Sequence, residues 1–295
     1  MKADYAEKPV LKMTGIEKEF SGVYALSGIT FDLYKGEIHC LVGENGAGKS
    51  TLMKVLSGAY SPSKGTISID GREYSSLTPA LSRELGINIV YQENDLVPSM
   101  SVAENIYVGN EVSDRFGFIK YKTKEQMEEF SIHLDPSAKI EDLSVSDQQF
   151  VKILKALSAQ TRVLIMDEPT SMFNVEDAAK VLRLAEAIAA RGISIVYISH
   201  SLEEIRRIAD RITVIRDGAV VRTYENENRD ISLALITQDM VGRPVDTFFK
   251  KDKNPIGDVC LEVKGLKLSK ESPEISFSVR HGEILGIAGM VGAGR

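Results

Sequence analysis

At 295 residues the chain is long enough for one large domain or two smaller ones. Hydrophobic residues make up 43% and charged residues 26%, and a net charge of −6 without a dense Lys/Arg run argues against nucleic acid as the main partner. The first ten residues are polar with mixed charge, so no signal peptide is expected, and no apolar run approaches the ~20 residues that span a bilayer. Any membrane association is therefore expected to go through a partner protein.

The chain is predicted to open with strands. Residues 10–20 alternate apolar and polar side chains, as do residues 29–33, and Lys35-Gly36 is predicted to be a hairpin turn into the next strand. Tyr24 lies in the predicted loop between the first two strands. Its ring could stack on a nucleobase, although a tyrosine at a strand end also commonly packs into a core.

The most informative stretch runs from Gly43 to Thr51 and has the pattern G-x-x-x-x-G-K-S. Residues 37–42 before it are mostly apolar, which is typical of a buried strand, and residues 50–56 after it carry apolar side chains at helical spacing. Strand, glycine loop and helix together form the context in which this motif binds nucleotide phosphates. Glycines let backbone N–H groups approach a phosphate, Lys49 can reach the β- and γ-phosphates, and the Ser50 hydroxyl can coordinate Mg²⁺.

A second polar position is expected at the end of a strand. Residues 66–69 are predicted to be a strand, a short helix should begin at Thr78-Pro79, and residues 87–91 form another strand that ends at Gln92. Ligands of open α/β sheets bind at the carboxyl ends of parallel strands. A neutral Gln there could ligate Mg²⁺ or orient a water, although Gln92 taken by itself is better explained as an ordinary loop residue.

The pattern changes between residues 95 and 159, where helices are predicted without an intervening strand. This segment is interpreted as a helical subdomain inserted into an α/β core. Ser144 or Ser146 could be the N-cap of its last helix, and a helix N-terminus can also hold an anion. The predicted helices cover residues 101–107, 122–134 and 147–157.

Two adjacent carboxylates, Asp167 and Glu168, follow the buried apolar run 163–166. Two such groups leaving a buried strand are costly to desolvate unless a cation compensates their charge. The alternative is an acidic helix N-terminus. Downstream of a phosphate-binding loop, the pattern favours Mg²⁺ coordination by Asp167 and a Glu168 that polarises an attacking water.

His200 stands just beyond the next predicted strand, so it should lie at the same sheet edge as Asp167 and Gln92. A ring nitrogen could donate to a γ-phosphate, although a lone histidine is more often structural. Cys40 and Cys260 are expected to be reduced, buried thiols, and no spacing suggests zinc. The remaining predicted elements are a helix over 175–190, a strand over 193–198, a hairpin of 211–215 with 219–223, and a helix over 231–240.

The opening of the chain recurs near its end. Ile275–Arg295 matches Ile29–Lys49 at a constant offset of 246, with nine identities in 21 positions, which indicates a duplicated domain. Because natural domains rarely stop inside a glycine loop, we expect the protein to continue beyond Arg295. The predicted organisation is a first domain at 1–242 with its helical subdomain at about 95–159, a linker at 243–258, and the start of a second domain at 259–295.

These motifs resemble the ATP-binding cassette (ABC) ATPases, the nucleotide-binding subunits of ABC transporters, over residues 10 to about 240. The resemblance implies an α/β P-loop NTPase core with an antiparallel β subdomain and an inserted helical subdomain. The duplicated layout is similar to the ATPases of bacterial pentose and hexose importers. In family terms the chain carries a Walker A loop at 43–51, a Q-loop at Gln92, a signature loop at 143–149, a Walker B strand ending at Asp167-Glu168, and a switch histidine at His200.

The resemblance also implies a function, cofactors and partners. It implies hydrolysis of ATP with Mg²⁺, coupled to monosaccharide uptake, by a peripheral protein at the cytoplasmic face of the bacterial membrane. Implied partners are integral membrane permease subunits, a periplasmic or extracellular sugar-binding protein and a second ABC domain in cis, with no nucleic acid. Implied catalytic residues are Lys49, Gln92, Glu168 and His200, and implied metal ligands are Ser50, Gln92 and Asp167. Implied nucleotide-binding residues are Tyr24, Gly43, Glu44, Asn45, Gly46, Ala47, Gly48, Lys49, Ser50, Thr51 and Ser144.

The sequence departs from the family pattern at three places. The signature loop keeps Ser144, but residues 145–147 replace the usual G-G-Q, and Asp147 adds a negative charge. Residues 171–174 lack the small residue and Asp of the usual D-loop, and Arg295 stands where the second glycine loop should carry Lys. The second site is therefore expected to be degenerate. A non-transport ABC ATPase and a nucleotide-gated scaffold remain alternative functions.

Overall fold

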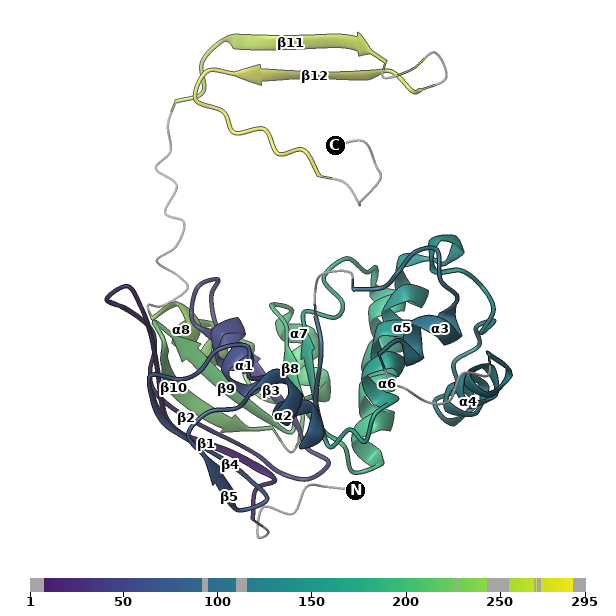
Figure 1. Cartoon of the computed structure of the whole chain (residues 1–295). Helices are drawn as coiled ribbons and strands as arrows, with labels where there is room; N and C mark the ends of the chain where they lie inside the picture. The colour runs from purple at the N-terminus through teal and green to yellow at the C-terminus, as the bar shows by residue number, and fades with distance from the viewer. Residues whose placement is uncertain are drawn as a thin grey trace. The chain divides into compact units, whose positions relative to one another are not determined.

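The computed structural model describes residues 8–91, 95–109, 116–226, 228–242, 255–267, 269 and 272–288. By its internal packing the chain divides into two compact units, Met1–Val245 and Asp246–Arg295. The first unit contains two β-sheets and the described helices, and the second contains a two-stranded antiparallel sheet (Figure 1).

The first unit begins with an antiparallel strand pair and then alternates strands with helices. Its strands are β1 (Leu11–Phe20), β2 (Val23–Leu33), β3 (Ile38–Val42), β4 (Lys64–Ile69), β5 (Arg72–Tyr74), β6 (Ile87–Val90), β7 (Val163–Asp167), β8 (Ser194–Ile198), β9 (Arg211–Arg216) and β10 (Ala219–Glu225). Its helices are α1 (Lys49–Leu56), α2 (Pro79–Glu84), α3 (Val102–Tyr107), α4 (Phe116–Glu129), the 3₁₀ turn Ile140–Asp142, α5 (Val145–Leu157), α6 (Val175–Ala190), α7 (Leu202–Ile208) and α8 (Leu233–Val241). The strands of the second unit are β11 (Val259–Leu266) and β12 (Ile275–Arg280).

The larger sheet has six strands in the order β10-β9-β3-β8-β7-β6. Its strands are parallel except for β10, which pairs antiparallel with β9. The other sheet of this unit is antiparallel, in the order β2-β1-β4-β5. In Figure 1 the antiparallel sheet lies on one side of the six-stranded sheet, and α3, α4, α5 and α6 lie on the other. This arrangement brings the carboxyl ends of β3, β7 and β8 to one edge.

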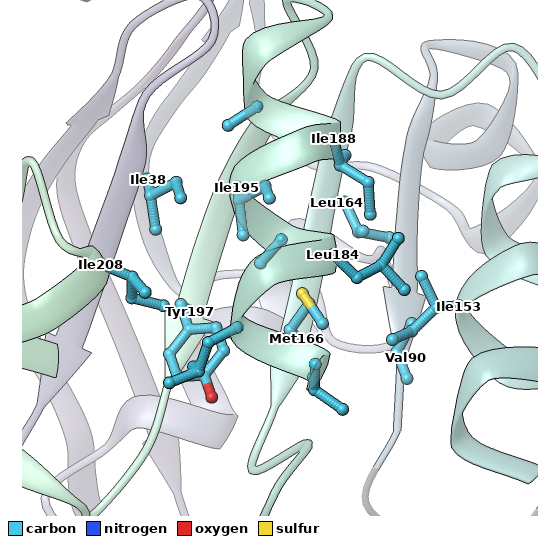
Figure 2. Close-up of a cluster of buried hydrophobic side chains, with 14 of the residues drawn as sticks. Ile38, Val90, Ile153, Leu164, Met166, Leu184, Ile188, Ile195, Tyr197 and Ile208 are labelled. Carbon is cyan, nitrogen blue, oxygen red and sulfur yellow. The ribbon is translucent and has the colours of Figure 1, made fainter. Parts of the chain in front are cut away.

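Both faces of the six-stranded sheet are buried along its inner parallel strands, whereas the edge strand β10 is largely exposed. Successive side chains of a strand point to opposite faces, so Cys40 of β3 packs in the core on the α6 side whereas Leu41 packs in the core shared with the antiparallel sheet. Figure 2 shows the first of these cores, in which Leu184 of α6 lies over Met166 of β7, beside Tyr197 of β8. A parallel sheet covered on both faces requires the nearly continuous apolar runs that these strands have.

Two predictions for the opening strands are wrong. Tyr24 lies within β2 and not in a loop, because Ser21 and Gly22 alone form the turn. Both turn residues have positive φ, 49° and 87°, as a tight hairpin turn of the primed type requires. Lys35-Gly36 is a turn but not a hairpin, because β2 and β3 belong to different sheets and the turn carries the chain from one to the other.

Most other elements match their predictions, and α6 has the predicted bounds. Helix α4 begins at Phe116 and not at residue 122, and α7 was not predicted. Cys40 is buried as expected, whereas Cys260 is exposed because it lies on the sparsely covered strand β11. None of the described helices is both long enough and apolar enough to cross a bilayer.

Candidate functional site

The glycine loop between β3 and α1 lines a pocket. Helix α1 begins at Lys49, and its N-cap residue Gly48 has φ 108° and supplies no side-chain cap. The first N–H groups of α1 therefore stay available to an anion, which the positive end of the helix dipole also favours. The pocket is lined by Ala25, Asn45, Gly46, Gly48, Lys49, Ser50, Thr51, Asp167 and Glu168.

Close packing explains why the loop needs glycine at two positions. A Cβ on Gly48 would lie 2.7 Å from the carbonyl oxygen of Ala25 and 2.9 Å from Cδ2 of Leu26, both on β2. A Cβ on Gly43 would lie 2.2 Å from the carbonyl oxygen of Ile215 on β9. The loop is thus held between elements of both sheets, which fixes the direction of its N–H groups.

The Lys49 side chain curls over its own loop. Its Nζ donates to the carbonyl oxygens of Gly43, at 2.7 Å, and Glu44, at 3.0 Å. Burial lowers the pKa of Lys49 below its usual value, while the nearby carboxylates of Glu168 and Asp167 act in the opposite direction. The ammonium group is therefore held where it can exchange these carbonyl contacts for phosphate oxygens.

Asp167 ends β7 beside the loop. Burial, and then the neighbouring Glu168, raise the pKa of its carboxyl above the usual value. Lys49 and a hydrogen bond from the Ser50 side chain act in the opposite direction. The structure thus brings together Lys49, Ser50 and Asp167, which come from two different strand ends. A desolvated carboxylate of this kind gains from a bound cation.

Glu168 and His200 contact each other directly. Nδ1 of His200 lies 2.6 Å from Oε2 of Glu168, and the His200 side chain is 68% exposed whereas that of Glu168 is 17% exposed. Glu168 has φ 50°, an uncommon value for a residue other than glycine, and its N–H donates to the carbonyl oxygen of Ile198 at 2.9 Å. A non-glycine residue in this region costs of order 1–3 kcal/mol and persists where the surroundings hold it.

Ser144, and not Ser146, is the N-cap of α5. Its Oγ accepts from the N–H of Asp147 at 3.1 Å and donates to Oδ2 of the same residue at 2.7 Å. The Ser146 hydroxyl lies 3.0 Å from that of Ser144. Ser144 does not line the pocket at the glycine loop, so within this unit its hydroxyl serves the helix.

The predicted adenine-stacking ring is not in the pocket lining. Tyr24 is 50% exposed, and its neighbour Ala25 lines the pocket instead. Phe20, across the same hairpin turn, is a second exposed ring at 41%, and it contacts Tyr60 with ring centroids 5.3 Å apart. Phe20 was not among the predicted site residues, although its position directly before the Ser21-Gly22 turn could have indicated an exposed aromatic ring. Gln92 lies outside the described residues.

The donor set is compatible with Mg²⁺. Within the described ranges no group of three or more His, Cys, Asp or Glu side chains is arranged to hold a metal ion. Asp167 and Ser50 nevertheless offer one carboxylate and one hydroxyl on the same side of the pocket. Mg²⁺ in nucleotide sites takes only one or two protein ligands, because phosphate oxygens and waters complete its shell.

Comparison with known proteins identifies similar chains. Residues 26–171 match the family described as ABC transporter. The chain is 45% identical over 294 residues to a ribose import ATP-binding protein of Rubrobacter xylanophilus, an alignment that covers 98% of this chain and 58% of that protein. It is 42% identical over 296 residues to a Geobacillus kaustophilus protein named for ribose, galactose and methyl galactoside import, with coverage of 98% and 58%. This chain thus spans less than two thirds of the length of either relative.

A solved structure shows the same fold. The ADP conformation of an ATP-binding cassette from an ABC transporter aligns with a TM-score of 0.72 and 22% identity, covering 80% of this chain and 100% of that one. The architecture of two sheets with a helical insert is therefore that of an ATP-binding cassette.

Proposed function

We propose that this chain is the ATP-binding and ATP-hydrolysing part of a bacterial sugar importer, because residues 26–171 match the family described as ABC transporter. One observation carries the proposal. The glycine loop, Asp167 and Glu168 line a single pocket, and His200 contacts Glu168 at its edge. This pocket combines N–H donors and an ammonium group for phosphates with a carboxylate that could activate water.

Each side chain has an assigned role. Backbone N–H groups of the loop and Lys49 hold the β- and γ-phosphates of ATP. Asp167 and Ser50 hold Mg²⁺, which when bound would offset phosphate charge, and Gln92 is proposed to complete that shell. Glu168 orients or deprotonates the attacking water, and His200 both holds Glu168 and donates to the γ-phosphate. Ser144 is proposed to contact the γ-phosphate bound by an opposing domain.

The proposed coupling uses a second ABC domain in cis, beginning near residue 259. Closure of the two domains would carry the signature serine of one to the γ-phosphate on the other, so that closure and hydrolysis depend on each other. The first glycine loop should carry most of the hydrolysis, because Arg295 replaces the loop lysine in the repeat.

The proposed partners are permease subunits in the membrane and a sugar-binding protein outside it, with this chain at the cytoplasmic face. A second groove lies between α2, β6 and α5. Apolar side chains such as Ile87 and Ile106 line it together with charged side chains of both signs, and Lys155 pairs with Asp95 at 3.0 Å. A permease segment with apolar and polar side chains would suit this mixed lining. The relatives' names mention ribose and galactose, and the sugar itself is expected to be selected by the other subunits.

The experiment is phosphate release by the full-length protein, alone and reconstituted with its permease and binding protein across a panel of pentoses and hexoses. Stimulation of wild-type hydrolysis by one sugar supports the importer proposal. Nucleotide binding without hydrolysis would instead support a nucleotide-gated scaffold. Hydrolysis that no membrane partner or sugar changes would favour a non-transport ATPase.

A further inference from the structure

Three hydroxyl groups converge on one oxygen atom of Glu204, next to the proposed catalytic pair. Oε2 of Glu204 accepts from Oγ1 of Thr170 at 2.7 Å, from the Tyr197 hydroxyl at 3.0 Å and from Oγ of Ser199 at 3.2 Å. The three donors are 6%, 0% and 4% exposed. Hydrogen bonds to a carboxylate are stronger than neutral ones, and burial removes competition from water.

Two of the three donors belong to the loops that carry the pair, and the third, Tyr197, lies in β8. Thr170 follows Glu168 by two positions in the loop after β7, and Ser199 directly precedes His200 at the end of β8. Glu204 itself lies in the first turn of α7. The Glu204 side chain therefore connects α7 to both loops, and no residue of α7 itself lines the pocket at the glycine loop.

The chain around His200 is fixed by the same cluster. The Ser199 hydroxyl donates to Glu204 and also accepts from the N–H of Ser201 at 3.0 Å. These two hydrogen bonds fix the positions of the residues on both sides of His200. Burial, and then the charge of Glu204, raise the pKa of Tyr197 well above its usual value. The phenol therefore keeps its proton and remains a donor.

We infer that Glu204 is a positioning residue that holds the loops of Glu168 and His200 in register and thereby keeps the two side chains in their 2.6 Å contact. Glu168 has a positive φ, so its loop needs such external restraint. The inference rests on the proposed function, because it assigns Glu204 a role only through Glu168 and His200. The competing explanation is a helix-capping carboxylate that contributes to folding alone.

Kinetics of the full-length protein give the first test. Glu204→Leu removes all three hydrogen bonds and should lower kcat about 10²-fold, since a displacement of about 1 Å in a catalytic group can cost this much. KM for ATP should change by less than about threefold, because the phosphate-binding loop is untouched. Glu204→Gln keeps an acceptor oxygen and should recover part of the rate. Glu203→Gln is the matched control, because Glu203 is exposed and paired with Arg206 on the same helix turn.

A spectroscopic readout separates positioning from stability. In protein labelled with ¹⁵N-histidine, the Nδ1 signal of His200, assigned with His200→Gln, should shift in Glu204→Leu and stay unchanged in Glu203→Gln. If Glu204→Leu does not fold, Thr170→Val and Ser199→Ala each remove one donor and should each lower kcat with the same displaced signal. A wild-type kcat in these variants, or a lower melting temperature with the His200 signal unmoved, overturns the inference.

The proposed function has its own separate test. Retained hydrolysis in Glu168→Gln would overturn the assigned site and the inference together. Loss of hydrolysis in Glu168→Gln with normal kcat in Glu204→Leu would overturn the inference alone.

Discussion

Nδ1 of His200 lies 2.6 Å from Oε2 of Glu168, although the two residues are 32 positions apart in the chain. The contact forms because β7 and β8 are neighbouring parallel strands, with Asp167 directly opposite Ile198. Parallel pairing brings the residues that follow each strand to the same edge. A carboxylate and an imidazole therefore meet beside the glycine loop.

Replacing the proposed base should uncouple ATP binding from hydrolysis. We expect Glu168→Gln to lower the rate of phosphate release about 10²–10⁴-fold, the usual contribution of a general base. ATP affinity should be retained, because Lys49 and the loop N–H groups are unchanged. Phosphate release and equilibrium binding of a fluorescent ATP analogue measure the two effects. Glu176→Gln, at an exposed position of α6, is the control, and an active Glu168→Gln protein would contradict the assignment.

Removing the loop ammonium should slow hydrolysis. Lys49→Ala is expected to raise the barrier by about 3–4 kcal/mol, roughly 10²–10³ in rate, by analogy with loss of one oxyanion donor. Steady-state phosphate release measures this loss. Lys180→Ala removes an exposed lysine from α6 and should behave as wild type. Near-normal turnover in Lys49→Ala would exclude this pocket as the active site.

Either of two exposed aromatic rings next to the β1–β2 turn, Tyr24 or Phe20, could stack on the adenine of ATP. Alanine replacement of a stacking ring should weaken ATP affinity by about 1–3 kcal/mol, whereas replacement of the other ring should have little effect. The structure places Tyr24 and Phe20 on opposite strands of the turn, each partly exposed. Binding of ATP and of inorganic triphosphate to Tyr24→Ala and Phe20→Ala decides between them. A true stacking ring affects ATP alone, and equal losses for both ligands would argue against stacking.

A buried histidine should make folding sensitive to acid. Burial, and then the charge of Arg211, lower the pKa of His39 to about 3, and its Nε2 lies 2.7 Å from the Thr213 hydroxyl. The unfolded chain binds a proton near pH 6.5 and the folded chain does not, so stability is present above that pH and is lost as pH falls. The loss between pH 7.5 and pH 5 is about 2 kcal/mol. Because neutral His39 carries no charge, its 3.6 Å approach to Glu37 is not an ion pair.

Urea unfolding followed by circular dichroism measures this dependence, which suits a chain without tryptophan. His39→Gln should flatten the decline between pH 7.5 and pH 5, whereas His133→Gln, at an exposed position, should leave it unchanged. An equally steep decline in His39→Gln would show that other groups cause it.

One buried ion pair should be sensitive to loss of either partner. Arg211 contacts Glu37 through Nε at 2.6 Å and Nη2 at 3.1 Å, and Glu37 is fully buried. Arg211→Met leaves that carboxylate without its cation and should cost about 3–5 kcal/mol of unfolding free energy. The double variant with Glu37→Gln should recover part of the loss. Urea unfolding measures both, with the exposed Arg207→Met as control, and a stability loss below 1 kcal/mol in Arg211→Met would contradict the argument.

Local patterns predicted much of the fold and the centre of the site. The strand and helix that flank the glycine loop at Gly43–Thr51 are specified by residues close to them in the sequence. The same is true of the apolar run before Asp167 and of the amphipathic helix α6. Periodicity and turn residues determine such elements with little reference to the rest of the chain. The repeat of this pattern after residue 275 was likewise visible from the sequence alone. Predictions failed where a local signal was ambiguous, as at the Lys35-Gly36 turn, where hairpin and sheet-crossing turns look alike.

The sequence by itself thus determined the glycine loop between a strand and a helix, the class of fold and the expectation that Asp167 and His200 lie at one edge. Only the tertiary structure decided which side chains meet there: Glu168 with His200, and Glu204 with Thr170 and Ser199. Arg211 likewise meets Glu37 from 174 positions away. The reason is physical. Hydrophobic periodicity assigns a residue to a face of its own element, whereas contacts between elements depend on strand order and register, which the packing of the whole core selects.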